Sequence, residues 1–182
     1  IFTMSGQQYR YLENMGNGNH MIIRNDLIRE RSWDELDETL ESWYGGLDPE
    51  VQAMVQPVAN SFTTGEVADD AVTFTGGTRW IPNNLEGAVA ADITQVVPSG
   101  TARAFALSLA DVTRLSGPRL AFPNHAQRSS AALGWWFLRT PAPEEAAWSV
   151  RPTGNLTGLV ERTASTTGGG VRPALILHQA RN

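Results

Sequence analysis

The clearest pattern along the chain is an apolar stripe that begins at Trp33 and ends at Leu47. Its residues recur at three- and four-residue spacing, which predicts an amphipathic helix. Ser32 and Glu35 form a capping-box pattern at the start of this helix, and the glycines at 45–46 end it. The carboxylates fall mostly on the other face, which indicates a solvated surface. The stripe consists of Trp33, Leu36, Leu40, Trp43, Tyr44 and Leu47, and the carboxylates are Asp34, Glu35, Asp37, Glu38 and Glu41.

Two further segments predict short helices. Asp48-Pro49-Glu50 supplies an N-cap residue followed by proline at the first helical position. Ser108 and Asp111 form a second capping-box pattern, which opens a helix through Leu115. Residues 117–134 are ambiguous, because two prolines interrupt them.

Short apolar groups predict strands near both ends of the chain. Residues 7–12 and 20–23 flank an Asn- and Gly-rich stretch at 14–19, which indicates a β-hairpin because these residues tolerate positive φ. Ala104–Leu107 is a short apolar strand in the middle of the chain. The C-terminal third predicts an antiparallel group with proline and glycine turns between its strands. Its strands are Trp135–Arg139, Trp148–Arg151, Leu156–Arg162 and Val171–His178.

The order of these elements predicts an α+β fold in which two or three helices are segregated from an antiparallel sheet. The length of 182 residues suits a single domain over 1–182. Residues 60–100 leave two interpretations open, since glycine, threonine, asparagine and proline are frequent there. They form either a functional loop region or a set of short strands.

Composition excludes several classes of function. The formal net charge is -5, and a nucleic-acid-binding domain needs a clustered basic surface instead. The chain has no cysteine, which excludes disulfides and thiolate chemistry, and all 14 basic residues are arginine, which excludes a lysine Schiff base. No apolar run approaches the length that crosses a bilayer, so we expect no membrane insertion.

Motifs for metal binding, cofactors and hydrolysis are weak. The three histidines lie far apart in the sequence, and Asp69-Asp70 is better explained as a solvated loop pair than as a metal site. There is no Gly-x-Ser-x-Gly elbow. The glycines at 168–170 precede a strand, so they lack the helix N-terminus of a phosphate-binding loop. We therefore expect no metal, no cofactor and no catalytic residues.

Aromatic and arginine side chains are the remaining candidates. In a strand, Trp135 and Trp136 point to opposite faces, so one of them can lie in the core. Trp80 and Trp148 are expected beside loops and partly exposed, where a flat ring suits contact with a sugar or peptide. Together with Arg151 they are the candidate ligand-binding residues. Arg139 and Arg172 lie next to apolar runs, and for both a structural role that ties strands or loops is favoured over anion binding.

The C-terminal motifs resemble those of a family of bacterial domains of uncharacterised function. Its members carry a Trp-Trp-Leu-Arg-Ser-Pro-like stretch, a Val-x-x-x-Gly turn, and a closing Gly-Val-Arg-Pro-Ala-Leu. Here these are WWFLRTP at 135–141, Val150–Gly154 and GVRPAL at 170–175, with Phe137 inserted and Thr140 in place of serine. The stretches at 9–12, 40–44 and 105–108 resemble other parts of the family more loosely. On this resemblance, Trp135, Trp136, Arg139, Arg172 and Pro173 are structural signature residues.

The resemblance implies a module of a larger secreted or surface-attached bacterial protein, with neighbouring domains in the same chain. The element order is also similar to C-type-lectin-like domains, although the calcium motifs of animal lectins are absent. The resulting hypothesis is a non-catalytic binding or adhesion module at the bacterial cell surface, with a glycan or a host or cell-surface protein as its partner. Its ligand surface would come from residues 60–100 and the loops after Pro141 and Gly154.

Two alternatives remain open. A carbohydrate-active hydrolase would need two carboxylates that face each other across a cleft, roughly 5 to 10 Å apart. A structural spacer domain would need no pocket at all.

Overall fold

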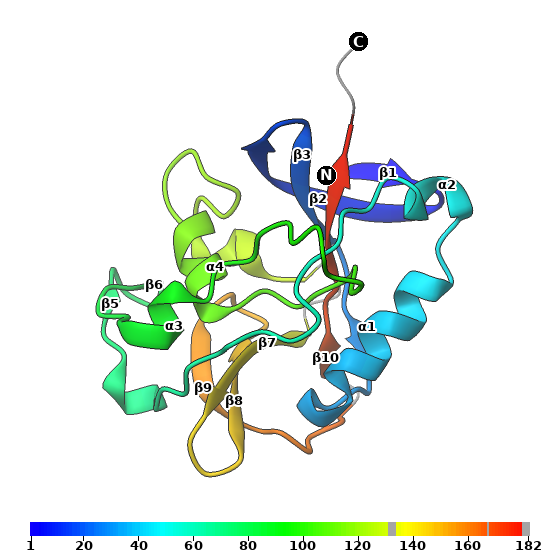
Figure 1. Cartoon of the computed structure of the whole chain (residues 1–182). Coiled ribbons are helices and arrows are strands. Elements are labelled where there is room, and N and C mark those ends of the chain that lie inside the picture. Colours follow the sequence, from blue (N-terminus) through cyan, green and yellow to red (C-terminus); the bar gives the residue numbers. More distant parts are fainter. Residues whose placement is uncertain (131–133, 167, 180–182) are drawn as a thin grey trace.

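The computed structural model describes residues 1–130, 134–166 and 168–179. The fold is α+β, as the sequence predicts, with mostly antiparallel sheets and few helices. A four-stranded and a five-stranded sheet make up most of it, and a two-stranded ribbon is added at one side. Figure 1 shows the first sheet at the top of the molecule, the second at the bottom, and α1 beside them.

The four-stranded sheet joins the two ends of the chain. Its order is β1 (Phe2–Met4), β2 (Gln7–Gly16), β3 (Asn19–Arg24) and β11 (Ala174–His178). The predicted hairpin is confirmed, and its turn has positive φ at 16, 17 and 18. Strand β11 runs antiparallel to β3, so the last strand completes a sheet that the first residues begin.

The five-stranded sheet has the order β4 (Ile28–Arg29), β10 (Gly169–Val171), β7 (Trp135–Ala142), β8 (Ala146–Val150) and β9 (Leu156–Glu161). Strand β10 is parallel to β7, and the other pairs are antiparallel. The single strand predicted over 171–178 is wrong, because the chain passes from one sheet to the other at Arg172-Pro173. Proline has no N–H to continue a ladder, which explains the break.

The helices begin where the capping patterns place them. A 3-10 turn η1 (Trp33–Glu35) leads into α1 (Leu36–Gly45), and α2 (Pro49–Gln52) follows. The Glu35 carboxylate accepts from the Ser32 N–H at 3.0 Å, and this bond lowers the pKa of Glu35. Helix α4 (Leu109–Leu115) has the predicted box of Ser108 and Asp111. Another 3-10 turn, η3 (His125–Arg128), lies in the region that the sequence left ambiguous.

The middle of the chain is mostly irregular but contains a few short elements. These are η2 (Asp69–Ala71), β5 (Phe74–Thr75), β6 (Ile81–Pro82) and α3 (Gly87–Ala91). The strand predicted at 104–107 is wrong, since only an isolated bridge of Phe105 to Ala174 forms. The carbonyls of Ala106 and Leu107 accept instead from the side chain and the backbone of Arg139.

The adjacent tryptophans of β7 lie on opposite faces, as predicted. Trp136 has no exposed surface and belongs to the main core, whereas Trp135 is half-buried and packs edge-on against Phe137. The Phe137 face of the sheet is covered by Leu36 and Leu40 of α1. Helix α1 is therefore fixed against the second sheet by Leu36 and Leu40, while Trp43 packs against Tyr9 of β2 in the first sheet. The side of the helix that carries its carboxylates stays exposed.

Three buried arginines, Arg128, Arg139 and Arg172, connect distant parts of the chain, and the last two belong to the C-terminal motifs. Arg139 donates to the Asp92 carboxylate at 2.6 Å and to the Thr94 hydroxyl at 2.6 Å. Within the described part of the chain, Arg172 donates to backbone carbonyls alone, those of Arg24 (2.7 Å), Asn25 (3.2 Å) and Arg128 (3.1 Å). Burial lowers the pKa of Arg172 to about 9, so its guanidinium is still charged at neutral pH.

Candidate functional site

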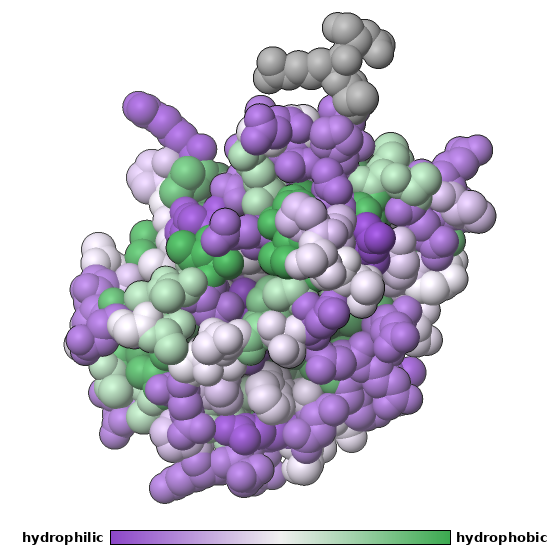
Figure 2. Space-filling view, viewed as in Figure 1, coloured by the Kyte–Doolittle hydropathy of each residue, from purple (hydrophilic) through white to green (hydrophobic). Residues whose placement is uncertain are grey.

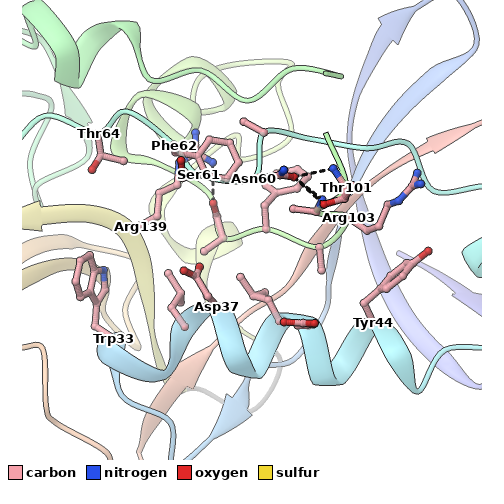
Figure 3. Close-up of a pocket in the computed structure, with 18 of the residues that line it drawn as sticks. Trp33, Asp37, Tyr44, Asn60, Ser61, Phe62, Thr64, Thr101, Arg103 and Arg139 are labelled. Atoms are coloured by element: carbon pink, nitrogen blue, oxygen red, sulfur yellow. Dashed lines mark hydrogen bonds between the residues drawn. The ribbon is translucent and has the colours of Figure 1, made fainter. Parts of the chain in front are cut away.

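A groove of about 770 Å³ runs beside α1, and we call it the α1 groove. One wall is formed by η1 and α1, and the other by the irregular segments 59–64 and 101–106. Figure 3 shows Trp33, Asp37 and Tyr44 along one wall of the groove, with Ser61 and Phe62 across from Asp37 and Arg103 across from Tyr44. A helix rises about 1.5 Å per residue, so Trp33 and Tyr44 are about 16 Å apart along the groove.

The helix wall carries three carboxylates, those of Asp34, Asp37 and Glu41. Their three- and four-residue spacing places them on one side of the helix. All three residues are exposed, and none of them forms an ion pair within the described part of the chain. Hydrophilic side chains cover the area over α1 in Figure 2. The wall therefore presents a row of uncompensated negative charge.

Three partly exposed aromatic side chains also line the groove. The indole N–H of Trp33 donates to the Leu138 carbonyl at 3.0 Å, and the Tyr44 hydroxyl donates to the Gln52 carbonyl at 3.3 Å. The ring of Phe62 lies over the Arg139 guanidinium, 3.6 Å from its carbon to the ring centroid. Trp33 and Tyr44 are fixed by carbonyls outside the groove and Phe62 by Arg139 beneath it, which leaves apolar ring surface for a ligand.

The opposite wall is polar and is held together by Asn60. The Asn60 side-chain oxygen accepts from the backbone N–H groups of Thr101 (2.6 Å) and Ala102 (3.1 Å), which joins the two irregular segments. Ser61 and Thr64 also line this wall, and their hydroxyls form no hydrogen bond with the described residues. Hydrogen-bonding groups thus remain free along this side.

The two arginines of the groove differ in how their charge is met. Arg139 is 4% exposed and is paired with Asp92 and, at 3.7 Å, with Asp111. Arg103 is half-buried and donates to the Val55 carbonyl at 2.8 Å. Among the described residues no carboxylate pairs with Arg103. The unpaired charges of the groove are therefore three carboxylates and one guanidinium.

The candidate ligand-binding residues from the sequence lie elsewhere. The expected exposure of Trp148 is wrong: it has no exposed surface, because it sits inside β8 and its indole N–H donates to the Val67 carbonyl at 2.9 Å. Trp80 is half-buried beneath the Arg128 guanidinium, 4.4 Å from the ring centroid. Arg151 is exposed. None of the three lines the α1 groove.

The sequence prediction missed most of the groove. Of the region 60–100 only Asn60, Ser61, Phe62 and Thr64 line it, and the loops after Pro141 and Gly154 do not. The helix carboxylates were interpreted as a solvated face, which is correct for their exposure. What that interpretation lacked is the wall opposite them, which comes from segments far away in the sequence.

Metal-binding groups are not assembled by the described residues. No cluster of three or more His, Cys, Asp or Glu side chains forms among them. Asp69, the weak candidate, instead accepts from the Gly158 N–H at 2.7 Å and pairs with Arg79 at 2.5 Å. In the same residues, no helix has the length and apolar character needed to cross a membrane.

Comparison with known proteins adds no relative: no protein-family model, no curated protein and no solved structure matches the chain.

Proposed function

We propose that the chain is a non-catalytic binding module of a secreted or surface-attached bacterial protein, with the α1 groove as its ligand site. The observation that carries this proposal is the groove itself, whose exposed aromatic surface, free hydroxyls and unpaired carboxylates face one another. Concave sites that combine apolar walls with a few polar groups are the usual form of ligand sites. A spacer domain would need no such groove.

The surface location and the C-type-lectin-like architecture belong to the same proposal. The architecture is supported by the pairing of the last strand with the N-terminal hairpin and by the helices between them. The surface location is supported by the resemblance of 135–141 and 170–175 to bacterial surface domains.

Binding is favoured over glycoside hydrolysis because the acids of the groove all come from one wall. Asp34, Asp37 and Glu41 share one side of the helix, and Asn60, Ser61 and Thr64 face them. A hydrolase of the usual kind needs an acid and a second carboxylate on opposite sides of the bond that it cleaves. The residues that line this groove supply carboxylates on one side only.

The test is to block the groove. Ser61→Trp places a large ring in the groove from its polar wall, and Thr63→Trp is the matched control, since Thr63 is exposed in the same loop but does not line the groove. We expect the 182-residue chain to bind ligands on glycan or peptide arrays, Ser61→Trp to lose that binding, and Thr63→Trp to retain it. Equal binding by both variants, or no binding to either array, would overturn the proposal. Release of reducing ends from a bound glycan, abolished by Asp37→Asn, would favour the hydrolase instead.

A further inference from the structure

The shape of the α1 groove suits a linear ligand. It extends along the whole of α1, with Trp33 at one end and Tyr44 at the other. An extended peptide advances about 3.3 Å per residue, so a groove of about 16 Å has room for about five residues. The side walls are an ordered helix and two loops joined by Asn60, so the groove is formed without a ligand.

Unpaired backbone groups also line the groove. Phe105 donates to and accepts from Ala174, so this edge of its segment is occupied by β11. In an extended segment, neighbouring residues direct their N–H and C=O groups to opposite edges. Ala104 lines the groove, and its N–H and C=O have no hydrogen-bond partner among the described residues. A peptide main chain can pair with these groups, as in the addition of a strand to a sheet edge.

The charge of the groove selects the kind of peptide. Asp34, Asp37 and Glu41 project along one wall without ion-pair partners, while the buried charge of Arg139 is already met by Asp92. Only Arg103, at the Tyr44 end, opposes them. Lysine and arginine side chains on one face of an extended peptide are about 6.8 Å apart, which their length allows them to match to carboxylates about 4.5 to 6 Å apart along the helix.

We propose that the α1 groove binds an extended basic segment of a protein partner, whose main chain pairs with Ala104 and whose Lys or Arg side chains contact Asp34, Asp37 and Glu41. This inference rests on the proposed binding function and narrows it from any ligand to a basic peptide. A neutral glycan is the competing ligand, because the aromatic rings suit it equally well, but a glycan does not need the carboxylate row.

The experiment measures the binding of three synthetic peptides to the 182-residue chain by calorimetry at low salt. They are acetyl-Lys-Ala-Lys-Ala-Lys-amide and the corresponding Glu-Ala and Ser-Ala peptides. We expect only the lysine peptide to bind and its affinity to fall as sodium chloride is added, because exposed charges are screened. Methylation of the central backbone nitrogens should weaken it roughly fivefold if main-chain pairing contributes.

Matched variants separate the groove from net charge. Asp37→Asn with Glu41→Gln should weaken the lysine peptide roughly tenfold, since each exposed pair contributes up to about fivefold. Glu38→Gln with Glu50→Gln changes the net charge equally but lies outside the groove, and should have no effect. Arg103→Gln should strengthen binding roughly twofold, which a purely structural role would not do.

The possible failures are distinguishable. If a neutral glycan binds, is blocked by Ser61→Trp, and is indifferent to Asp37→Asn with Glu41→Gln, the binding function stands and the basic-peptide inference is wrong. If both charge-matched pairs weaken the lysine peptide equally, the attraction is non-specific and the inference is also wrong. If neither peptides nor glycans bind, the proposed function fails together with it.

Discussion

Arg139 and Arg172 are both buried, yet the protein meets their charges in two different ways. Arg139 pairs with the carboxylates of Asp92 and Asp111, and the ring of Phe62 covers it. Arg172 has backbone carbonyls as its hydrogen-bond partners and lies over the ring of Trp136. A carboxylate partner can be exchanged by mutation, whereas a backbone carbonyl cannot. Asp92 and Arg139 can therefore be substituted together, so that neither is left without its partner. Any substitution of Arg172 leaves the carbonyls of Arg24 and Asn25 without this donor.

The largest expected effect comes from Arg172→Met. The half-buried carbonyls of Arg24 and Asn25 lose this donor, while the Arg128 carbonyl keeps the Trp136 indole N–H at 3.2 Å. Each unsatisfied carbonyl costs about 1 to 3 kcal/mol and the lost cation–π contact with Trp136 about 0.5 to 1 kcal/mol, so we expect the free energy of unfolding to fall by about 3 to 5 kcal/mol. Urea denaturation followed by tryptophan fluorescence measures this change. Arg151→Met is the control, because Arg151 is exposed and its loss should matter by less than about 0.5 kcal/mol. Similar urea midpoints for the two variants would show that the hydrogen bonds of Arg172 to backbone carbonyls do not stabilise the fold.

The second prediction concerns the pair of Asp92 and Arg139. Asp92→Ala leaves a buried guanidinium without its closest partner and should cost about 3 kcal/mol. Adding Arg139→Met removes the stranded charge, so the double variant should be more stable than Asp92→Ala alone. Asp111 keeps its bonds to Thr94 and Ser108 in either case. A double variant that is less stable than Asp92→Ala would show that Asp92 and Arg139 cannot be removed together, and the expected difference from Arg172 would be wrong.

A smaller effect is expected for Phe62→Leu. The substitution keeps an apolar side chain over Arg139 but removes the ring face, and a cation–π contact contributes about 0.5 to 1 kcal/mol. In the Arg139→Met background this cost should largely disappear. Thermal denaturation of the wild type, the two single variants and the double variant measures the coupling between Phe62 and Arg139. If Phe62→Leu costs as much in the Arg139→Met background as in the wild type, the effect is due to packing alone.

The smallest effect is expected for the pH dependence of stability, to which the buried, uncharged phenol of Tyr9 contributes. Tyr9 is 1% exposed, and burial raises its pKa above 10.0 although Arg24 acts in the opposite sense. Because the folded state then retains the phenol proton longer than the unfolded state, the contribution of Tyr9 to stability should be constant below about pH 10 and fall above it. Tyr9→Phe should flatten this decline in urea midpoints measured from pH 8 to 11. An identical decline of the urea midpoint in both proteins would show that a group other than Tyr9 causes it.

Local signals in the sequence were sufficient for the elements that depend on them. Ser32 with Glu35 and Ser108 with Asp111 begin helices as predicted, and the Asn and Gly residues at 14–19 form the turn of a hairpin. These features need only neighbouring residues, because a cap or a tight turn is satisfied within one turn of chain.

The errors occur where distant residues decide the outcome. The segment 104–107 is apolar and was predicted as a strand, but Arg139 takes the carbonyls that a ladder would use. Trp148 was expected beside a loop, yet residues near 67 cover it. The α1 groove combines one helix with two irregular segments, and no pattern within a single stretch reveals that they meet.

The pairing of β11 with β3 sets the order in which the chain can assemble. Arg172 reaches Arg24 across 148 positions, and His178 reaches Asn19 across 159. Closing a loop of this length carries a large entropic cost and slows folding. During synthesis, the hairpin of β2 and β3 leaves the ribosome early, and its β3 edge stays open until residues 174–178 follow. Such an edge is a template for pairing with other chains, so this is the interval in which a chaperone would protect the nascent protein most.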